Sequence, residues 1–319
     1  MELSTIIIAA GSGKRMKSEK SKLIHKIYDK ELIKRVYDLA SSLGHDIVAV
    51  VGYKKDQIMN LLGESVRYAY QEELLGTGHA VMMTEKYFSN KSGKVLVLYG
   101  DVPILRKETI EKLIKQSINN NDDATILTAI VDNPLGYGRI IRDLNGEIEE
   151  IVEDKDATSE QKRIREVNSG IYCFDIEELF KALKDVKSNN AQNEYYLTDV
   201  IKIMKQKGLK IGTSLCLDSD EILGINDKCQ LEYVTNCLKL RINKKHMLDG
   251  VVLIDKNNTY IYDDVQIGVD TVIYPNVTLK GKTIIGKNCT IGSNSYINNC
   301  IIGDDTIVKP GEVLENVEK

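Results

Sequence analysis

Two glycines and a run of basic side chains near the start of the chain have the types and spacing of a phosphate-binding loop. Gly11 and Gly13 follow the apolar run Thr5–Ile8, and the basic residues that come next include Arg15 and Lys22. Glycine lets the backbone come close to a ligand, so that free N–H groups face phosphate oxygens. The spacing fits neither a Walker A motif nor the dinucleotide fingerprint. The excess of positive charge favours an anionic ligand over a plain structural turn.

Asp101 is a candidate metal ligand. It stands just past the apolar run Val95–Tyr99, within the stretch Gly100–Pro103. A carboxylate is a hard oxygen ligand of the kind that suits Mg²⁺. The alternative is a helix N-cap before Thr109–Ile118, or a solvated turn. Asn226, ahead of a long helical segment, is by itself best explained as an N-cap.

A second glycine-containing loop carries groups that suit a nucleobase. Gln71 can pair with a base edge through its donor and acceptor groups. Gly76 and Gly78 flank Thr77 and allow a close approach to a flat ring. The alternative is an ordinary loop-to-helix junction with Thr77 as its cap. His79 is expected to pack in the protein rather than to bind a ligand.

Polar residues later in the chain are candidates for sugar recognition. Glu153 and Asn168 can hydrogen-bond sugar hydroxyls. The alternatives are an exposed strand end for Glu153 and turn chemistry for Asn168. Thr198 is expected in the first turns of a helix that opens with Asn193–Asp199 and runs to about residue 206.

The elements between these groups must position them. Short apolar runs at Thr5–Ile8, Ile47–Gly52 and Val95–Tyr99 are typical of buried parallel strands. Between them, Glu31–Leu43 and Lys55–Leu62 have the apolar spacing of helices. This alternation predicts an α/β fold with ligands at the carboxyl ends of the strands. Hairpin-like connections from residue 124 onward predict that the sheet is mixed, although mainly parallel.

The C-terminal part repeats with a period of six residues. Each repeat is expected to form one short strand whose aliphatic residue points into a central prism. After the seventh repeat the phase slips by one residue, and the pattern then continues through Ile302, Val308 and Leu314. The period predicts a β-helix whose open faces favour self-association. The seven aliphatic positions are Ile261, Ile267, Ile273, Leu279, Ile285, Ile291 and Ile297.

The composition of the whole chain excludes several classes of protein. A length of 319 residues favours two domains, and 42% hydrophobic with 28% charged residues is typical of a soluble globular protein. A formal net charge of −4 argues against wholesale nucleic-acid binding. No apolar stretch approaches transmembrane length, and the start does not resemble a signal peptide. Six cysteines without CxxC spacing predict reduced thiols in the cytoplasm and no zinc site.

Taken in order, the motifs resemble those of bacterial N-acetylglucosamine-1-phosphate uridylyltransferases, over nearly the whole chain. The pattern Gly11-x-Gly13-x-Arg15 alone would indicate only a sugar nucleotidyltransferase. Leu75–Ala80 and Asn193–Tyr196 narrow the resemblance to this branch. The other matching motifs are Ala9–Met16, Lys22-Leu23, Gln71, Tyr99–Pro103, Gly136–Arg139, Asn168–Gly170 and Leu197–Asp199.

The resemblance implies a fold, a reaction and partners. It implies a Rossmann-like nucleotidyltransferase domain at residues 1–225, a linker helix at 226–248 and a short left-handed β-helix at 249–319. The implied reaction joins UTP and N-acetylglucosamine 1-phosphate to give UDP-N-acetylglucosamine and pyrophosphate, with Mg²⁺ as cofactor, for cell-wall precursor synthesis. The expected location is the cytoplasm, with no nucleic-acid or membrane partner. The repeat itself predicts a homotrimer.

The resemblance also assigns roles, and it reverses the N-cap interpretations of Asp101 and Asn226 by making them the Mg²⁺ ligands. Arg15 and Lys22 become the catalytic residues, which contact the triphosphate and then the charge that develops on the α-phosphorus. The implied uridine site is Ala9, Ala10, Gly11, Gln71, Gly76 and Thr77, and the implied sugar site is Gly138, Glu153, Asn168 and Thr198.

Three departures from the family pattern matter. Ser169 and Lys14 stand where the family usually has threonine; Ser169 keeps the hydroxyl, whereas Lys14 adds a charge near the triphosphate. Bifunctional members continue for many more coils that build an acetyltransferase site, so acetyltransferase activity is not expected of this chain.

Two other functions stay open. The first is the same reaction with another sugar 1-phosphate or another base. The second is a non-catalytic scaffold or regulatory homologue. The presence of Arg15, Lys22, Asp101 and Asn226 argues against this second alternative.

Overall fold

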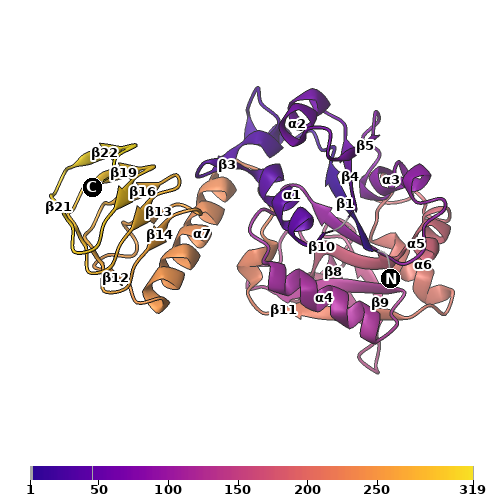
Figure 1. The fold of residues 1–319 in the computed structure, drawn as a ribbon. Helices are drawn as coiled ribbons and strands as arrows, with labels where there is room; N and C mark the ends of the chain where they lie inside the picture. The colour runs from indigo at the N-terminus through magenta and orange to yellow at the C-terminus, as the bar shows by residue number, and fades with distance from the viewer. Residues whose placement is uncertain (1–2, 45, 319) are drawn as a thin grey trace. The chain divides into compact units, whose positions relative to one another are not determined.

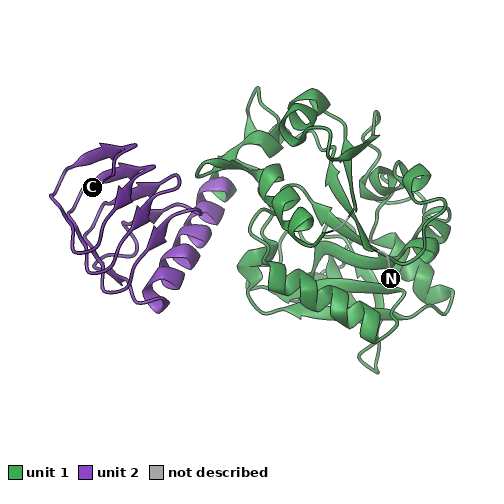
Figure 2. Ribbon diagram, viewed as in Figure 1, with its two compact units in different colours: residues 1–230 green, residues 231–319 purple. Residues whose placement is uncertain are grey.

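The computed structural model describes residues 3–44 and 46–318. The chain divides into two compact units, residues 1–230 and 231–319 (Figure 2). The predicted linker helix corresponds to α7 (Lys228–Leu248), most of which lies in the second unit. The division of the chain at residues 225 and 248 stays a prediction. Within the described ranges, no helix is both long and apolar enough to span a membrane.

A nine-stranded sheet forms the centre of the first unit (Figure 1). Its main path runs β11-β7-β10-β6-β1-β4-β5, and β8 and β9 extend it from β10. All strands of the main path except β10 point the same way, so the sheet is mixed and mainly parallel, as predicted. The strands are β1 (Leu3–Ala9), β4 (Asp46–Val51), β5 (Arg67–Tyr70), β6 (Lys94–Tyr99), β7 (Ala124–Ile130), β8 (Arg139–Arg142), β9 (Ile148–Val152), β10 (Glu166–Asp175) and β11 (Ile211–Cys216), with a separate hairpin of β2 (Lys26–Ile27) and β3 (Lys30–Glu31).

Helices cover both faces of this sheet. Alternate strand residues point to opposite sides, and both sides carry apolar residues that pack against helices. Ile7 and Leu98 pack in a core with α1 (Leu32–Ser42), α2 (Lys55–Leu62) and α4 (Lys107–Asn119). Ile6 and Val97 pack in a second core with α3 (Thr77–Met82), α5 (Ile176–Leu183) and α6 (Asp199–Gln206). The fully buried strands explain why their sequences are continuously apolar rather than alternating.

The direction of the strands gathers the candidate residues at one edge. Parallel β1, β4, β5 and β6 all end there, and Ala10, Gly52, Gln71 and Gly100 are the residues that follow them. Because β10 runs the other way, its beginning, with Asn168, reaches the same edge. The predicted grouping of the first glycine loop with the residues after β6 is confirmed.

The helix predicted to open at Asn193–Asp199 begins only at Asp199, so that part of the prediction is wrong. The preceding segment instead pairs with the loop ahead of α3. The Tyr195 N–H donates to the Leu75 carbonyl (2.7 Å), and the Gly78 N–H donates to the Tyr195 carbonyl (2.8 Å). These long-range backbone bonds override the local helical pattern, and they hold the segment before Thr198 against the loop of residues 71–78, here called the nucleobase loop.

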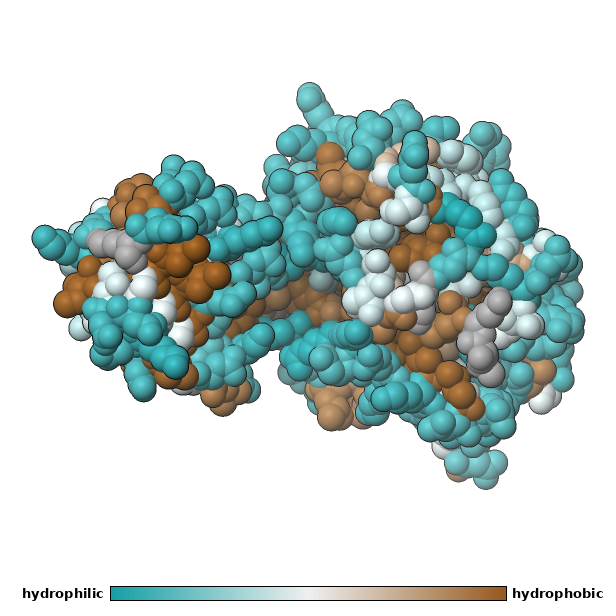
Figure 3. Space-filling model, in the orientation of Figure 1, coloured by the Kyte–Doolittle hydropathy of each residue, from teal (hydrophilic) through white to brown (hydrophobic). Residues whose placement is uncertain are grey.

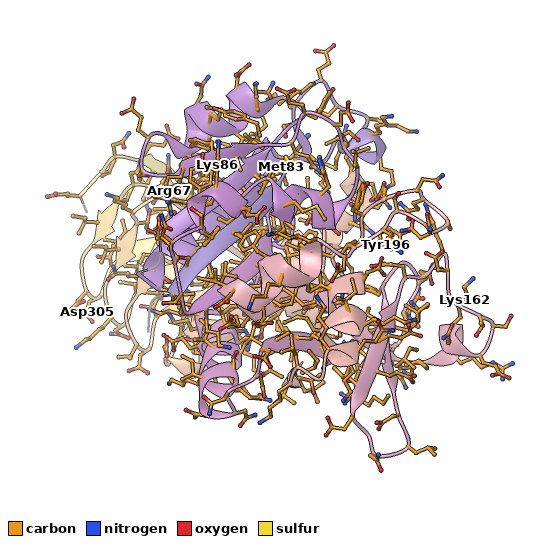
Figure 4. The ribbon with its side chains drawn as sticks, turned by 90° about the vertical axis from the view of Figure 1, so that its right-hand side faces the viewer. Arg67, Met83, Lys86, Lys162, Tyr196 and Asp305 are labelled. Carbon is orange, nitrogen blue, oxygen red and sulfur yellow. The ribbon has the colours of Figure 1, made fainter. Side chains whose placement is uncertain are left out.

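The edge strand β5, which leads into Gln71, is braced from outside. The Tyr87 hydroxyl donates to the backbone carbonyl of Tyr68 in β5 (2.7 Å). The cationic groups of Arg67 and Lys86 lie 5.2 and 5.0 Å from the centre of the Tyr87 ring, and Figure 4 shows these two residues side by side. Such cation–π contacts and the charge they bring protect a sheet edge from further pairing.

The second unit contains a short left-handed β-helix of hexapeptide repeats next to α7. Strands one coil apart stack on one another in three parallel sheets, and the predicted aliphatic positions point inward. Leu279 pairs with Ile297 one coil on, 18 residues away, whereas Ile297 pairs with Leu314 after 17, which is the predicted phase slip. Asn and Asp at positive φ form most corners. The strands are β12 (Val252–Leu253), β13 (Tyr260–Ile261), β14 (Gln266–Ile267), β15 (Val272–Ile273), β16 (Thr278–Lys280), β17 (Ile284–Ile285), β18 (Thr290–Ile291), β19 (Tyr296–Asn298), β20 (Ile301–Ile302), β21 (Ile307–Val308) and β22 (Val313–Glu315).

Candidate active site

An open cleft of about 310 Å³ lies at the edge where β1, β5 and β6 end. Its walls include the first glycine loop, the nucleobase loop and the residues after β6. It therefore brings together chain segments that are far apart in the sequence, from Ile8 to Glu194. The predicted site residues that line it are Ala9, Gly11, Lys22, Gln71, Gly76, Thr77 and Asp101.

Lys22 and two side-chain oxygens form the charged centre of this site. The Lys22 Nζ lies 2.5 Å from Asp101 Oδ2 and 3.1 Å from Asn226 Oδ1. The side chains of Lys22 and Asp101 are only 11% and 19% exposed, which strengthens their attraction. The Ile225 N–H donates to the Asp101 carbonyl (2.9 Å), and this bond holds Asn226 beside Asp101. One carboxylate and one amide oxygen thus converge on one cation.

Gly13 is the residue that lets Lys22 reach this position. It has φ of 60°, in the left-handed region that glycine favours. A Cβ at this position would lie 2.6 Å from the Cβ of Lys22. Any other residue would therefore push the stem of Lys22 away from the loop.

The N-cap interpretations of Asp101 and Asn226 do not hold in the structure. The Asp227 Oδ1 accepts a hydrogen bond from the Gln230 N–H (2.8 Å), so Asp227 caps α7 and the side chain of Asn226 is left to meet Lys22. Likewise, α4 begins at Lys107, six residues after Asp101. Both predicted metal ligands are thereby available as ligands.

The four predicted sugar-binding residues lie together in a second group. Thr198 Oγ1 donates to Glu153 Oε1 (3.1 Å), and the Asn168 N–H donates to the Gly138 carbonyl (2.9 Å). Gly138 lies against this group, since a Cβ on it would be 2.9 Å from Ile151 Cγ2, 3.6 Å from Asn168 Cβ and 3.7 Å from Glu153 Cδ. A pyranose ring could use this glycine for close approach and the polar groups for its hydroxyls.

Glu153 is electrostatically unusual in this group. Burial raises the pKa of Glu153 above its ordinary value, although the hydrogen bond from Thr198 opposes the shift. Three neighbouring carboxylates raise it further: Asp156, Asp199 and Asp154. Glu153 therefore gains a proton at a higher pH than an exposed glutamate does.

Two residues that sequence reasoning missed hold the groups in place. Tyr99, at the end of β6, lines the cleft and hydrogen-bonds Thr77, and its ring lies 2.9 Å from where a Cβ on Gly170 would stand. Arg139 is 2% exposed and pairs with Asp154 (2.9 Å), the neighbour of Glu153. The position of Tyr99 immediately before Gly100 and Asp101 was the one local signal for it, whereas nothing local indicates that Arg139 is buried.

Two other predicted residues do not line the cleft. Arg15 is exposed and makes no hydrogen bond or ion pair with another residue of the described ranges. Ala10 is 1% exposed and packs in the core, where its carbonyl accepts from the Tyr53 N–H (3.2 Å). Their assigned roles in catalysis and in uridine binding stay predictions.

Comparisons with known proteins bear on this site. Residues 4–215 match the family model described as nucleotidyl transferase, and residues 282–311 match the bacterial transferase hexapeptide model. The chain is 46% identical over 317 residues to the "Bifunctional protein GlmU" of Clostridioides difficile, covering 99% of this chain and 69% of that protein. It is 48% identical over 315 residues to the protein of the same name from Acetivibrio thermocellus, covering 98% and 68%. The chain thus spans about two thirds of the length of these relatives.

Proposed function

The chain belongs to the nucleotidyl transferase family and, within it, to the GlmU proteins, and from this premise we propose that it transfers the uridylyl group of UTP to N-acetylglucosamine 1-phosphate. The products are pyrophosphate and UDP-N-acetylglucosamine, and the latter serves cell-wall precursor synthesis. The observation that carries the proposal is the convergence of Lys22, Asp101 and Asn226 in the cleft. This charged centre shares its cleft with the nucleobase loop. Tyr99 hydrogen-bonds Thr77 of that loop and packs against Gly170, two residues after Asn168.

The oxygens of Asp101 and Asn226 suit Mg²⁺. Both already converge on a cation, the ammonium of Lys22, and both are hard ligands. Asp101 and Asn226 would hold the ion with substrate phosphates completing its shell, as Mg²⁺ is usually held in proteins. When bound, the ion neutralises charge on the phosphates.

The reaction needs positioning and charge neutralisation more than proton transfer. A phosphate oxygen of the sugar 1-phosphate attacks the α-phosphorus of UTP in line, one new P–O bond forms, and the bond to the pyrophosphate breaks. The nucleophile is already anionic, so no general base is required. Lys22 turns from Asp101 and Asn226 toward the phosphate oxygens and stabilises their charge in the transition state. Arg15, exposed on the loop, is free to swing onto the triphosphate.

The test of the function is pyrophosphate release by the purified chain with UTP, Mg²⁺ and a panel of sugar 1-phosphates. Release is expected with N-acetylglucosamine 1-phosphate. A preference for glucosamine 1-phosphate or another sugar would overturn the substrate assignment, and a preference for another nucleotide would overturn the base. No release with any pair would make a non-catalytic role the leading explanation.

The raised pKa of Glu153 leads to a pH prediction for the sugar. The carboxylate accepts a hydrogen bond from a sugar hydroxyl, and its protonation removes this acceptor. Since the pKa of Glu153 is raised, this acceptor begins to be lost at a higher pH than it would be for an ordinary glutamate. The KM for the sugar 1-phosphate is expected to rise as the pH falls from neutral, while the KM for UTP changes little.

The variant Glu153→Gln provides the control for this prediction. Glutamine keeps the shape and one acceptor but carries no charge and does not titrate. The KM for the sugar should therefore be raised at neutral pH by about tenfold, because a hydrogen bond to a charged acceptor becomes one to a neutral amide. Its KM should then follow only the titration of the sugar phosphate itself. If KM for the sugar 1-phosphate rises equally at low pH in the wild type and in E153Q, Glu153 does not cause the rise.

We also propose that the chain forms a homotrimer through its second unit and acts in the cytoplasm. Apolar side chains are visible on the outer surface of this unit (Figure 3), and Ile301, Ile307 and Val313, one on each of its three sheets, are 49%, 68% and 69% exposed. All six cysteines are thiols, which suits a reducing compartment. Light scattering at micromolar concentration tests the trimer proposal, and a measured mass equal to that of a monomer would contradict it.

A further inference from the structure

Gln71 has both hydrogens of its side-chain amide in use. Its Nε2 lies 2.9 Å from the Gly76 carbonyl and 3.1 Å from His79 Nδ1. A backbone carbonyl can only accept, so the group that faces it must be the NH₂ and not the oxygen. Gln71 is 4% exposed, so these two partners define the orientation of its amide.

His79 can accept from this NH₂ only in one form. Its Nδ1 must carry a lone pair, so the ring is the neutral tautomer with its proton on Nε2. The ring lies 6.3 Å from the ring of Tyr195, whose backbone bonds to Leu75 and Gly78 anchor the same loop. The imidazole is thus fixed beside Gln71 by its packing, and it supplies the second acceptor.

What remains of Gln71 for a ligand is one acceptor. Both donors are used, and no hydrogen bond from another described residue reaches its Oε1. Gln71 lines the cleft. At this point of the cleft, Gln71 therefore offers a nucleobase a hydrogen-bond acceptor and no donor.

We propose that His79 is a positioning residue that sets the base preference of the enzyme by holding the Gln71 amide in this orientation. Uracil presents an N3–H donor, which pairs with Gln71 Oε1. Cytosine presents a bare N3 acceptor at the same place, so two acceptors face each other and the complex is disfavoured. Without His79 the Gly76 carbonyl alone opposes rotation of the amide, and the site discriminates less. This inference rests on the proposed function, because the base is that of the nucleotide substrate.

Two substitutions at position 79 separate this role from simple packing. His79→Asn places its Oδ1 on the same Cγ from which Nδ1 extends, so the acceptor is kept. His79→Leu has a similar size and keeps an apolar contact with Tyr195, but it has no acceptor. Binding of UTP and of CTP to the full chain is measured by calorimetry for the wild type and both variants, together with kcat/KM for each nucleotide.

The expected result is a UTP-over-CTP preference that falls about tenfold in H79L, as for one lost buried hydrogen bond, and stays within about threefold of the wild type in H79N. If the role of His79 were merely structural, H79L would weaken the binding of UTP and CTP alike and leave the ratio of their affinities unchanged. That result would overturn the proposal. A loss in H79N as large as that in H79L would overturn it as well.

The binding data keep this proposal separate from the proposed function. If the wild type releases no pyrophosphate but binds UTP over CTP, the function fails, and the ratio in H79L still decides the role of His79. If the wild type shows no preference between the two nucleotides in binding or turnover, the role of His79 is refuted whatever the reaction.

Discussion

Replacing Lys22 with methionine is expected to lower kcat for pyrophosphate release by about 100- to 1,000-fold, the usual cost of removing one group that stabilises charge in a transition state. Methionine has a similar length and keeps the apolar stem that packs against Gly13. It lacks only the ammonium that lies between Asp101 and Asn226. Steady-state assays with saturating UTP and sugar phosphate measure the effect.

Lys20→Met is the matched control, because Lys20 is an exposed lysine of the same basic segment. Its kcat is expected to stay within about threefold of the wild type, since an exposed charge is screened by solvent. If general positive charge near the loop were what matters, the two variants would lose activity alike. If kcat of K22M were within tenfold of the wild-type value, Lys22 would not have the catalytic role proposed for it.

Asp101→Asn is expected to lower activity at a fixed low Mg²⁺ concentration by at least about 100-fold, since a metal ion supplies several kcal/mol of charge stabilisation in such reactions. The amide keeps the shape and one oxygen but loses the charge that attracts a cation. Raising the Mg²⁺ concentration should restore part of the rate in D101N. It should restore none in K22M, whose metal ligands are intact.

Chelation completes this test. Removing Mg²⁺ with EDTA is expected to abolish turnover in the wild type, and adding the ion back should restore it. A melting temperature within a few degrees of the wild type would show that D101N is folded. Equal dependence on Mg²⁺ in the wild type and in D101N would mean that Asp101 does not hold the ion, and another ligand would have to be sought.

Several parts of the fold could be predicted because their signals are local. The apolar runs that became β1, β4 and β6 are continuous, as strands buried on both faces require. The six-residue period places one aliphatic side chain on each side of the β-helix, so even the one-residue slip after Ile297 is visible in the chain. The rule that ligands bind at the carboxyl ends of parallel strands also predicts that Gly11 and Asp101 lie at one edge of the sheet.

Local patterns failed where a distant segment offered a better partner. Residues 193–198 have helical spacing, but their backbone groups bond to the loop at 75–78 instead. Asn226 is a good N-cap by residue type, yet Asp227 takes that place. In the first case the competing partner lies elsewhere in the fold, and local propensity is weaker than the tertiary contacts that override it. In the second case the cap is the neighbouring residue, and the long-range contact is the one that Asn226 makes with Lys22.

By itself, then, the sequence determined the two kinds of fold, the order of the motifs and the family that they resemble. Only the tertiary structure decided which side chains meet. Lys22 and Asn226 are 204 positions apart, and Glu153 and Thr198 are 45 apart. The hydrogen bond between His79 and Gln71, although eight positions apart, likewise depends on the folded loop. The physical reason is range: periodicity and composition act over a few neighbouring residues, whereas a site is built by long-range contacts that exist only once the sheet has formed.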